Sequence, residues 1–330
     1  MKCFNENSLL DFSEKDFASV ISVDTFIITR FNLRLWSKDK NNKSTLSDEW
    51  LSQRFELFEE YCFPSIKAQT NKEFVWMCMF DELSTLPYLD RVKQYHDEFP
   101  QFLPLFLDEN DSCHLTRCID DVILKFKDAS KDLITMRVDN DDALHIDFVA
   151  KVKEYAEKAT GTTIYSFKYG IQYYVKEKLA VHIPFYNNHF LCMVNKNYAE
   201  DDFKQRSDFV KQGDQNELVC SRLTKNRTFK KVKHVLEFNH FDTKHYPYPF
   251  VCNSEDKNMW VEVIHATNVS NDCKMTLNQG PIQEETFLVD NYNVGGVLPY
   301  VSRLKFWRFI SVRFIEHIKM KISSKLQRFL

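Results

Sequence analysis

The chain has few glycines, no long apolar run and no closely paired cysteines. Only six glycines occur in 330 residues, and no internal repeat is visible, which favours one continuous domain. No stretch approaches 18 apolar residues, so no membrane-spanning helix is expected. The nine cysteines include no C-x-x-C pair, and Cys113 and Cys118 around His114 match no common zinc spacing. Reduced core thiols are therefore favoured over disulfides or structural zinc.

Basic charge is also scarce outside the C-terminus. The first residues, MKCFNENSLLDFSEKDF, are acidic where a signal peptide needs a basic flank and an apolar run, so we expect a cytoplasmic protein. The net charge is −3, but residues 301–330 hold eight Lys/Arg and one Glu, leaving 36 Lys/Arg and 46 Asp/Glu elsewhere. This distribution argues against nucleic-acid binding and places any affinity for anionic surfaces at the C-terminus.

The pattern of apolar residues predicts strands that alternate with helices. Residues 24–33 are typical of a strand, and 48–68 of an amphipathic helix with Ser47 as N-cap and a kink at Pro64. Further strands are expected at 72–82, 101–108 and 131–139, and further helices at 88–99, 115–127 and 143–159. Residues 162–183 are expected to form antiparallel strands at the sheet edge. The order predicts an α/β fold with a mostly parallel, right-handed sheet.

An acidic cluster follows one of these strands, in ITMRVDNDDALHIDF (residues 134–148). Ligands of open α/β sheets bind beyond the carboxyl ends of the strands, where Asp81 also lies. The D-x-D of Asp139 and Asp141 is a reasonable holder for Mg²⁺ or Mn²⁺ with a substrate diphosphate. The alternative is that Asp141 or Asp142 only caps a helix beginning near Ala143. Three acids exceed what one cap requires, but short acidic motifs also recur by chance.

Three segments together resemble a known family: TRFNL, then WLSQRFELFEEYCFPSIKAQTNKEFVWMCMFDE, then ITMRVDNDDAL. They are similar to the putative rhamnosyltransferase-type family of GT-A fold glycosyltransferases. The likeness is good over residues 24–150 and looser over 160–275. It implies a Rossmann-like GT-A domain, with a mostly parallel central sheet flanked by helices and an antiparallel edge, and the chemistry of sugar transfer.

The resemblance also implies roles for individual residues. Asp139 and Asp141 would form the metal-binding D-x-D, and the nucleotide-sugar pocket would be lined by Thr29, Arg30, Asn32 and Asp81. Arg137, two residues before Asp139, points to the same face of the strand and could contact the diphosphate. A structural ion pair between Arg137 and an aspartate is the alternative.

The catalytic base is expected in FVKQGDQNEL. The chain also resembles the larger inverting GT-A superfamily, whose members often carry a G-[ED]-D-type turn with the catalytic base at this place, and here Asp214 follows Gly213. Gln215 replaces the usual second acid, so either Asp214 or Glu217 could take the proton of the acceptor hydroxyl in an inverting transfer. A plain turn is the alternative.

Two further segments hold candidate ligands. His265 ends WVEVIH, where the family resemblance implies a third metal ligand; a histidine bonded to backbone would look the same. Asn187, Asn188 and His189 lie beside aromatic residues and could bind sugar or acceptor hydroxyls, or form a turn.

The C-terminal segment is predicted to be a basic amphipathic helix, separate from a catalytic domain at residues 1–300. Over 302–330, apolar residues recur at spacings of three or four: Trp307, Ile310, Phe314, Ile318, Ile322, Leu326 and Phe329. Basic residues fill much of the rest, as in helices that lie on an anionic membrane surface. The alternative is a terminal helix that packs onto the catalytic domain or a second subunit.

The sequence therefore predicts a metal-dependent, inverting glycosyltransferase. It would move a hexose or deoxyhexose from a nucleotide-diphosphate sugar to a growing surface polysaccharide or lipid-linked glycan, at the inner face of the plasma membrane. A nucleotidyltransferase or phosphatase also gathers carboxylates at strand ends, but the first strand lacks their motifs. A non-catalytic glycan- or nucleotide-binding scaffold of the same fold remains the other possibility.

Overall fold

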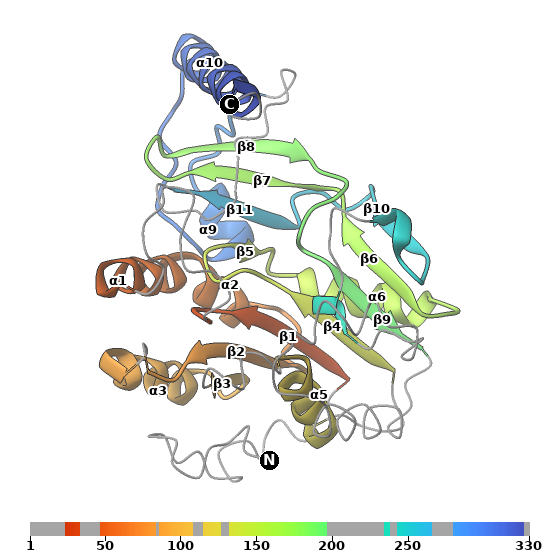
Figure 1. The fold of residues 1–330 in the computed structure, drawn as a ribbon. Helices are drawn as coiled ribbons and strands as arrows, with labels where there is room; N and C mark the ends of the chain where they lie inside the picture. Colours follow the sequence, from red (N-terminus) through yellow and green to blue (C-terminus); the bar gives the residue numbers. More distant parts are fainter. Residues whose placement is uncertain are drawn as a thin grey trace.

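The structure is a computed structural model of an α/β protein with two sheets (Figure 1). It describes residues 24–33, 47–83, 86–107, 115–126, 132–196, 234–237, 243–265 and 280–326. The central sheet has seven strands in the order β10-β6-β9-β4-β1-β2-β3, and a second sheet has four in the order β5-β11-β7-β8. The mostly parallel central sheet with helices and an antiparallel edge agrees with the GT-A fold expected from the sequence.

Four neighbouring parallel strands form one side of the seven-stranded central sheet. They are β1 (Thr25–Arg30), β2 (Val75–Asp81), β3 (Phe102–Leu107) and β4 (Leu133–Arg137). Every residue of β2, β3 and β4 is buried, as their continuous apolar runs predict for strands covered on both faces. Beyond β4, β9 (Cys192–Asn195) runs antiparallel between β4 and β6 (Thr163–Phe167), and β10 (Phe250–Asn253) pairs with β6.

Helices cover both faces of this sheet, because alternate residues of each strand point to opposite sides. On one face, Ile27, Trp76 and Met136 pack in a core with α1 (Asp48–Leu57), α3 (Leu89–Glu98) and α6 (Phe148–Lys158). On the other face, Phe26 and Met77 pack with α5 (Leu115–Phe126). The described residues also form three short 3₁₀ turns: η3 (Leu86–Tyr88), η4 (Val235–Glu237) and η5 (Thr243–His245).

The helix predicted over 48–68 is present, with its distortion just before Pro64. The Ser47 hydroxyl accepts a hydrogen bond from the backbone N–H of Trp50 at 3.3 Å, so the predicted N-cap is confirmed. After α1 the chain widens into a π-helical turn, η2 (Phe58–Cys62), and then continues as α2 (Phe63–Lys67). A π turn changes the hydrogen-bond register upstream of a proline that cannot donate, which explains the expected kink.

The helix predicted to begin at Ala143 begins later, and that prediction is wrong. Ala143–Leu144 form the short strand β5, antiparallel to β11 (Trp260–Ile264), and α6 starts only at Phe148. The Asp142 carboxylate accepts a hydrogen bond from the Val263 N–H at 2.8 Å and ties this segment to β11. A strand that lies more than a hundred residues downstream therefore overrides the local helical pattern.

The remaining strands and helices form a second layer. In the second sheet, β7 (Tyr169–Tyr174) pairs antiparallel with β8 (Leu179–Pro184) and parallel with β11. The predicted antiparallel strands over 162–183 are thus present as β7 and β8, but they lie in this second sheet and not at the edge of the central sheet, which contains β6. Gly170 lets β7 approach the Trp260 ring, since an added Cβ would lie 2.1 Å from Trp260 Cδ2. The short helix α9 (Phe287–Tyr292) packs beside this sheet.

The C-terminal helix α10 (Arg303–Leu326) lies beside β8 (Figure 1). The predicted helix is therefore present, but Ile310 of its predicted apolar stripe is docked. Together with Phe306, which is not in that stripe, Ile310 is buried against Tyr174, Leu179 and Val181. No helix in the described part of the chain is long and apolar enough to cross a membrane.

Candidate functional site

The parallel strands β1, β2 and β4 end at one edge of the central sheet, and polar side chains connect these ends. Asn32, just after β1, accepts a hydrogen bond from the Asp81 N–H at the end of β2 at 2.9 Å. Asn140, in the acidic loop (residues 139–142) after β4, donates its amide to the Phe31 carbonyl at 2.7 Å. The acidic loop is thus fixed against the neighbouring strand end, where α/β sheets bind ligands.

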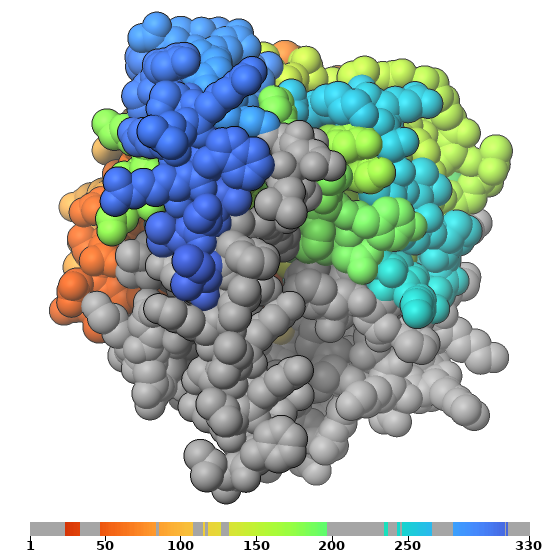
Figure 2. All heavy atoms as spheres, turned by 90° about the horizontal axis from the view of Figure 1, so that it is seen from above, coloured from red at the N-terminus to blue at the C-terminus, as the bar shows by residue number. Residues whose placement is uncertain are grey.

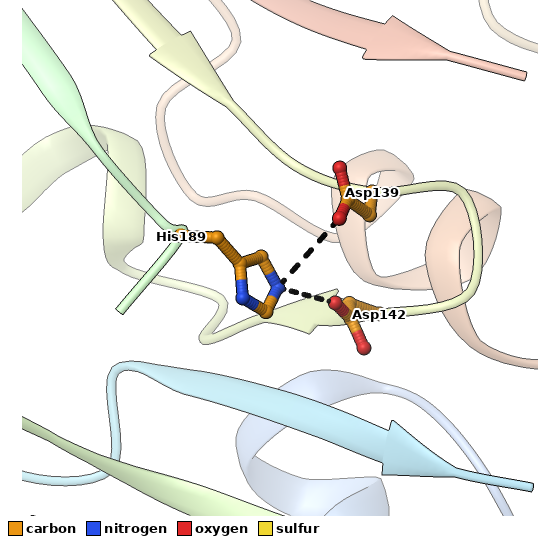
Figure 3. A group of neighbouring side chains, drawn as sticks. All are labelled: Asp139, Asp142 and His189. Carbon is orange, nitrogen blue, oxygen red and sulfur yellow. Dashed lines mark hydrogen bonds and ion pairs between the residues drawn. The ribbon is translucent and has the colours of Figure 1, made fainter. Parts of the chain in front are cut away.

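Two aspartates of the acidic loop converge on one histidine (Figure 3). His189 Nε2 lies 2.7 Å from Asp142 Oδ2 and 3.9 Å from Asp139 Oδ2, and the ligand atoms of the three residues all lie within 4.8 Å of one another. Asp142 and His189 are buried, whereas the Asp139 side chain is 36% exposed. Asp139 is therefore the member of this group that is open to a ligand.

The three groups have perturbed proton affinities. Burial raises the pKa of the Asp139 carboxyl, but the nearby charges of His189, Arg137 and Arg30 outweigh it and hold that pKa below its usual value. Burial raises the pKa of Asp142 to about 7, with Asp141 and Asp139 adding to the rise and His189 opposing it. The pKa of His189 is also raised, because its bond to Asp142 outweighs its burial. Of the two aspartates in this group, Asp139 is therefore the one that keeps its negative charge at neutral pH.

Asp141 is held from both sides. Its Oδ2 accepts from Arg54 Nη1 at 2.6 Å and lies 2.8 Å from His265 Nε2, and Arg54 Nη1 also contacts Asn140 Oδ1 at 3.2 Å. The Arg54 guanidinium lies over the Trp50 ring at 4.9 Å. Burial opposes ionisation of Asp141, but Arg54 and His265 hold its pKa well below its usual range. His265 therefore lies in contact with Asp141, and its predicted role as a metal ligand stays a prediction.

Sequence reasoning missed Arg54. It lies on α1 at a position of the apolar stripe, three residues after Leu51 and four before Phe58, and it is 4% exposed. A charged residue on the buried face of an amphipathic helix needs a buried partner. The position of Arg54 in the apolar stripe was visible in the sequence. It could not show that the partner is Asp141, which lies 87 residues away.

The capping alternative for the acidic loop does not hold. The helix α6 begins at Phe148 with Asp147 at the N-cap position, so Asp141 and Asp142 lie well before its first turn. Their carboxylates instead contact Arg54, His265 and His189. Asp141 and Asp142 therefore bind side chains of other elements and do not cap a helix.

The predicted nucleotide-binding residues occupy different environments. Thr29 is fully buried, and its hydroxyl accepts from the Trp76 indole N–H at 3.0 Å, so its side chain faces the core. Asn32 and Asp81 are buried at the strand ends, and Arg30 is partly exposed there.

Arg137 is 7% exposed, and its Nε has no hydrogen-bond partner among the described residues. Burial and the like charge of Arg30 lower its pKa, while Asp139 raises it. The alternative of a structural ion pair is not realised, since no carboxylate in the described part of the chain lies within ion-pair distance of Arg137. A buried guanidinium beside Asp139 is well placed for an anionic ligand.

The segment predicted to bind sugar divides into three environments. Asn188 is fully buried and forms a turn: its amide donates to the Phe167 and Phe185 carbonyls, and its oxygen accepts from Ser166 and the Phe190 N–H. His189 joins the acidic loop. Asn187 is partly buried, and its Oδ1 has no hydrogen-bond partner among the described residues. The predicted bases Asp214 and Glu217, with Gly213, lie outside the described residues, as do Cys113 and His114.

Comparison with known proteins identifies the family. No curated protein matches the chain. The family described as "Putative rhamnosyl transferase" matches residues 25–201, more than half of the chain, from β1 through the acidic loop and past β9. Its name indicates a glycosyltransferase, as the three quoted segments and the site at the carboxyl ends of the strands suggest. The chain therefore belongs to the "Putative rhamnosyl transferase" family.

Proposed function

We propose that the protein is a metal-dependent, inverting glycosyltransferase. It transfers a hexose or deoxyhexose from a nucleotide-diphosphate sugar to a growing surface polysaccharide or lipid-linked glycan. One observation carries the proposal: at the carboxyl end of β4, Asp139 groups with Asp142 and His189 and feels the charge of Arg137, whose buried Nε has no partner among the described residues. Cation-binding groups next to a buried guanidinium suit a metal–diphosphate.

The donor set fits a divalent cation. Carboxylate oxygens and one imidazole suit Mn²⁺, and carboxylates suit Mg²⁺. Ligand atoms about 2.1 Å from a common ion lie roughly 3 to 4.2 Å apart. The 3.9 Å between His189 Nε2 and Asp139 Oδ2 is in that range, and the 2.7 Å contact with Asp142 needs only a small opening. A bound cation would supply charge neutralisation for the departing nucleoside diphosphate.

The other residues have roles that their contacts support. Arg137 and Arg30 bind the diphosphate, and Asp81, held by Asn32, contacts the nucleoside. Asp141 fixes the acidic loop by holding Arg54 and His265 at 2.6 and 2.8 Å. Because these two side chains already surround Asp141 Oδ2, we assign the metal to the group of Asp139, Asp142 and His189 rather than to the set of Asp139, Asp141 and His265 expected from the family resemblance.

The chemical step needs a carboxylate that takes the proton of the acceptor hydroxyl while that oxygen attacks the anomeric carbon. Asp214 is the first candidate and Glu217 the second, from the sequence alone. Asn187 is a candidate contact for the acceptor or the sugar. A non-catalytic scaffold of this fold would bind nucleotide or glycan without turnover, which separates it from the enzyme.

Binding of nucleotides to purified full-length protein tests this assignment. Thermal unfolding is measured with UDP, GDP and dTDP and their sugars, with Mn²⁺ or with EDTA. A ligand at a hundred times its Kd stabilises the native state by about 2.7 kcal/mol. We expect that at least one nucleotide raises the unfolding temperature only when metal is present. This rise should be lost in Asp139→Asn and kept in the control Asp132→Asn. Asp132 is a partly exposed aspartate at the opposite end of β4 that pairs with Lys196.

Two histidine variants then distinguish the two metal sets. With the assignment above, His189→Gln loses the metal-dependent rise, whereas His265→Gln retains most of it. The reverse result would return the metal to Asp141 and His265. Stabilisation by nucleotide that is equal with Mn²⁺ and with EDTA would contradict metal dependence altogether.

A further inference from the structure

The described side chains of α10, up to residue 315, form two apolar faces, and only one of these two is docked. Phe306 and Ile310 are buried against β7 and β8. On the opposite side, Leu304, Trp307 and Ile315 are 82%, 52% and 52% exposed, and these three residues form the exposed apolar face of the helix. Leu304, Trp307, Ser311 and Ile315 follow one another at spacings of three, four and four residues, so they lie on one side of the helix. The start of α10 forms a ridge on the molecular surface (Figure 2).

Contacts with the second sheet fix the rotation of α10. Phe309 packs edge-on against Tyr174 at 4.8 Å, and Arg313 Nη2 lies 3.2 Å from Glu177 Oε1. The Arg313 guanidinium also lies over the Tyr174 ring at 5.9 Å. The predicted stripe is therefore divided: Ile310 serves the fold, and Trp307 is left on the exposed side. Among the described side chains of α10, those of the exposed apolar face and its flanks are the ones that a partner can meet.

The flanks of the exposed apolar face are basic. Arg303, Lys305 and Arg308 are all exposed, and residues 301–330 carry eight Lys/Arg with one Glu, a local charge of +7. Two copies of this helix would bring like charges together, which disfavours a second copy of the chain as the partner. A basic helix with an exposed tryptophan and aliphatic residues instead complements an anionic lipid surface.

We propose that α10 binds the surface of an anionic bilayer through Leu304, Trp307 and Ile315, with Arg303, Lys305 and Arg308 at the headgroups. Because the other face of the helix is docked on β7 and β8, membrane binding also sets the orientation of the sheets on the bilayer. The protein then acts as a peripheral protein on the cytoplasmic side of the membrane. This proposal does not rest on sugar transfer, since vesicle binding is measured without turnover.

Vesicle sedimentation tests the charges. Full-length protein is mixed at low salt with vesicles of phosphatidylcholine alone or with 30–40% phosphatidylglycerol, roughly a third anionic lipid as in surfaces that attract basic segments. We expect binding only to the anionic vesicles. Neutralising the three flanking residues should weaken it roughly 100-fold, the equivalent of about 1 kcal/mol for each charge. The variant is R303Q/K305Q/R308Q, and the matched control, exposed lysines on α3, α6 and η5, is K93Q/K158Q/K244Q.

Intrinsic fluorescence tests the face. The other described tryptophans, Trp50, Trp76 and Trp260, are buried, and Trp36 lies outside the described residues. Anionic vesicles with brominated acyl chains should strongly quench the tryptophan fluorescence of the wild-type protein. Trp307→Phe should still bind but lose most of that quenching, whereas L304S/W307S/I315S should lose binding and remain folded.

Four results would overturn the proposal. They are full-length protein that ignores anionic vesicles at low salt, equal weakening by both triple glutamine variants, full quenching in Trp307→Phe, and self-association without lipid that Trp307→Ser abolishes. The last would show that a second copy covers this face. None of them bears on the nucleotide-binding test of the acidic loop, so the two proposals fail separately.

Discussion

Replacing Arg54 with methionine isolates the buried ion pair that holds the acidic loop. The Arg54 and Asp141 side chains are 5% and 7% exposed, with 2.6 Å between Nη1 and Oδ2. Removing one partner of a buried pair leaves an uncompensated charge and costs about 3–5 kcal/mol. His265 still contacts Asp141, so we expect the lower end, about 3 kcal/mol, in the free energy of unfolding.

Chemical denaturation of four proteins measures this pair: wild type, Arg54→Met, Asp141→Asn and the double variant. Because each single variant leaves a buried charge that the double variant lacks, the double should lose less stability than the two singles together, by about 2–3 kcal/mol. Arg91→Met is the matched control. Arg91 bonds Glu59 at the same distance, 2.6 Å, but these side chains are 34% and 39% exposed, so its loss should cost less than about 1 kcal/mol.

The same variants make a pH prediction. Arg54 lowers the pKa of Asp141 in the folded protein, so this ion pair stabilises the fold above the unfolded pKa of about 3.9, and the stabilisation is lost as pH falls through the lower folded value. Without Arg54 the folded pKa rises, and the cost of Arg54→Met should shrink between pH 7 and pH 4. Two results would refute the role of Arg54 as the cation that holds Asp141: stability losses of the two single variants that add up in the double variant, or a cost of Arg54→Met that grows toward pH 4.

Two other predictions concern the core and the catalytic base. Gly170→Ala places a Cβ 2.1 Å from Trp260 Cδ2 and should lower stability by about 1–3 kcal/mol or more, whereas Gly161→Ala, with nothing within 4 Å, should be nearly neutral in thermal unfolding. Asp214→Asn should lower kcat strongly and leave donor affinity unchanged, because the base acts on the acceptor. If Glu217→Gln is the more damaging change, the base is Glu217.

Local sequence patterns predicted most of the central sheet. The apolar runs of β2, β3 and β4 are long enough to identify strands buried on both faces, and the D-x-D follows β4 as expected. The strand β5 could not be predicted in the same way. It has two residues, and only pairing with β11 and the bond from Val263 to Asp142 define it.

The site was predicted in position but not in its pairings. Parallel strand ends meet at one edge whatever the details, so the residues after β1, β2 and β4 were bound to come together. Which carboxylate faces which cation depends on contacts between residues far apart in sequence: His189 is 47 residues from Asp142, and Arg54 is 87 from Asp141. The stripe of α10 shows the same limit, since periodicity cannot tell Ile310, which docks, from Trp307, which does not.

The most direct test of the proposed sugar transfer is the release of nucleoside diphosphate from nucleotide-diphosphate sugars by the full-length protein. Each donor is incubated with Mn²⁺ or Mg²⁺, with EDTA, and with Asp139→Asn or Asp132→Asn in place of the wild type. We predict that at least one donor releases its nucleoside diphosphate only with metal, that Asp139→Asn abolishes this release, and that Asp132→Asn retains it. Water or an added glycan accepts the sugar in this assay. Metal-dependent binding without release from any donor under either condition would contradict the proposed sugar transfer, and release that is equal in Asp139→Asn would contradict the site.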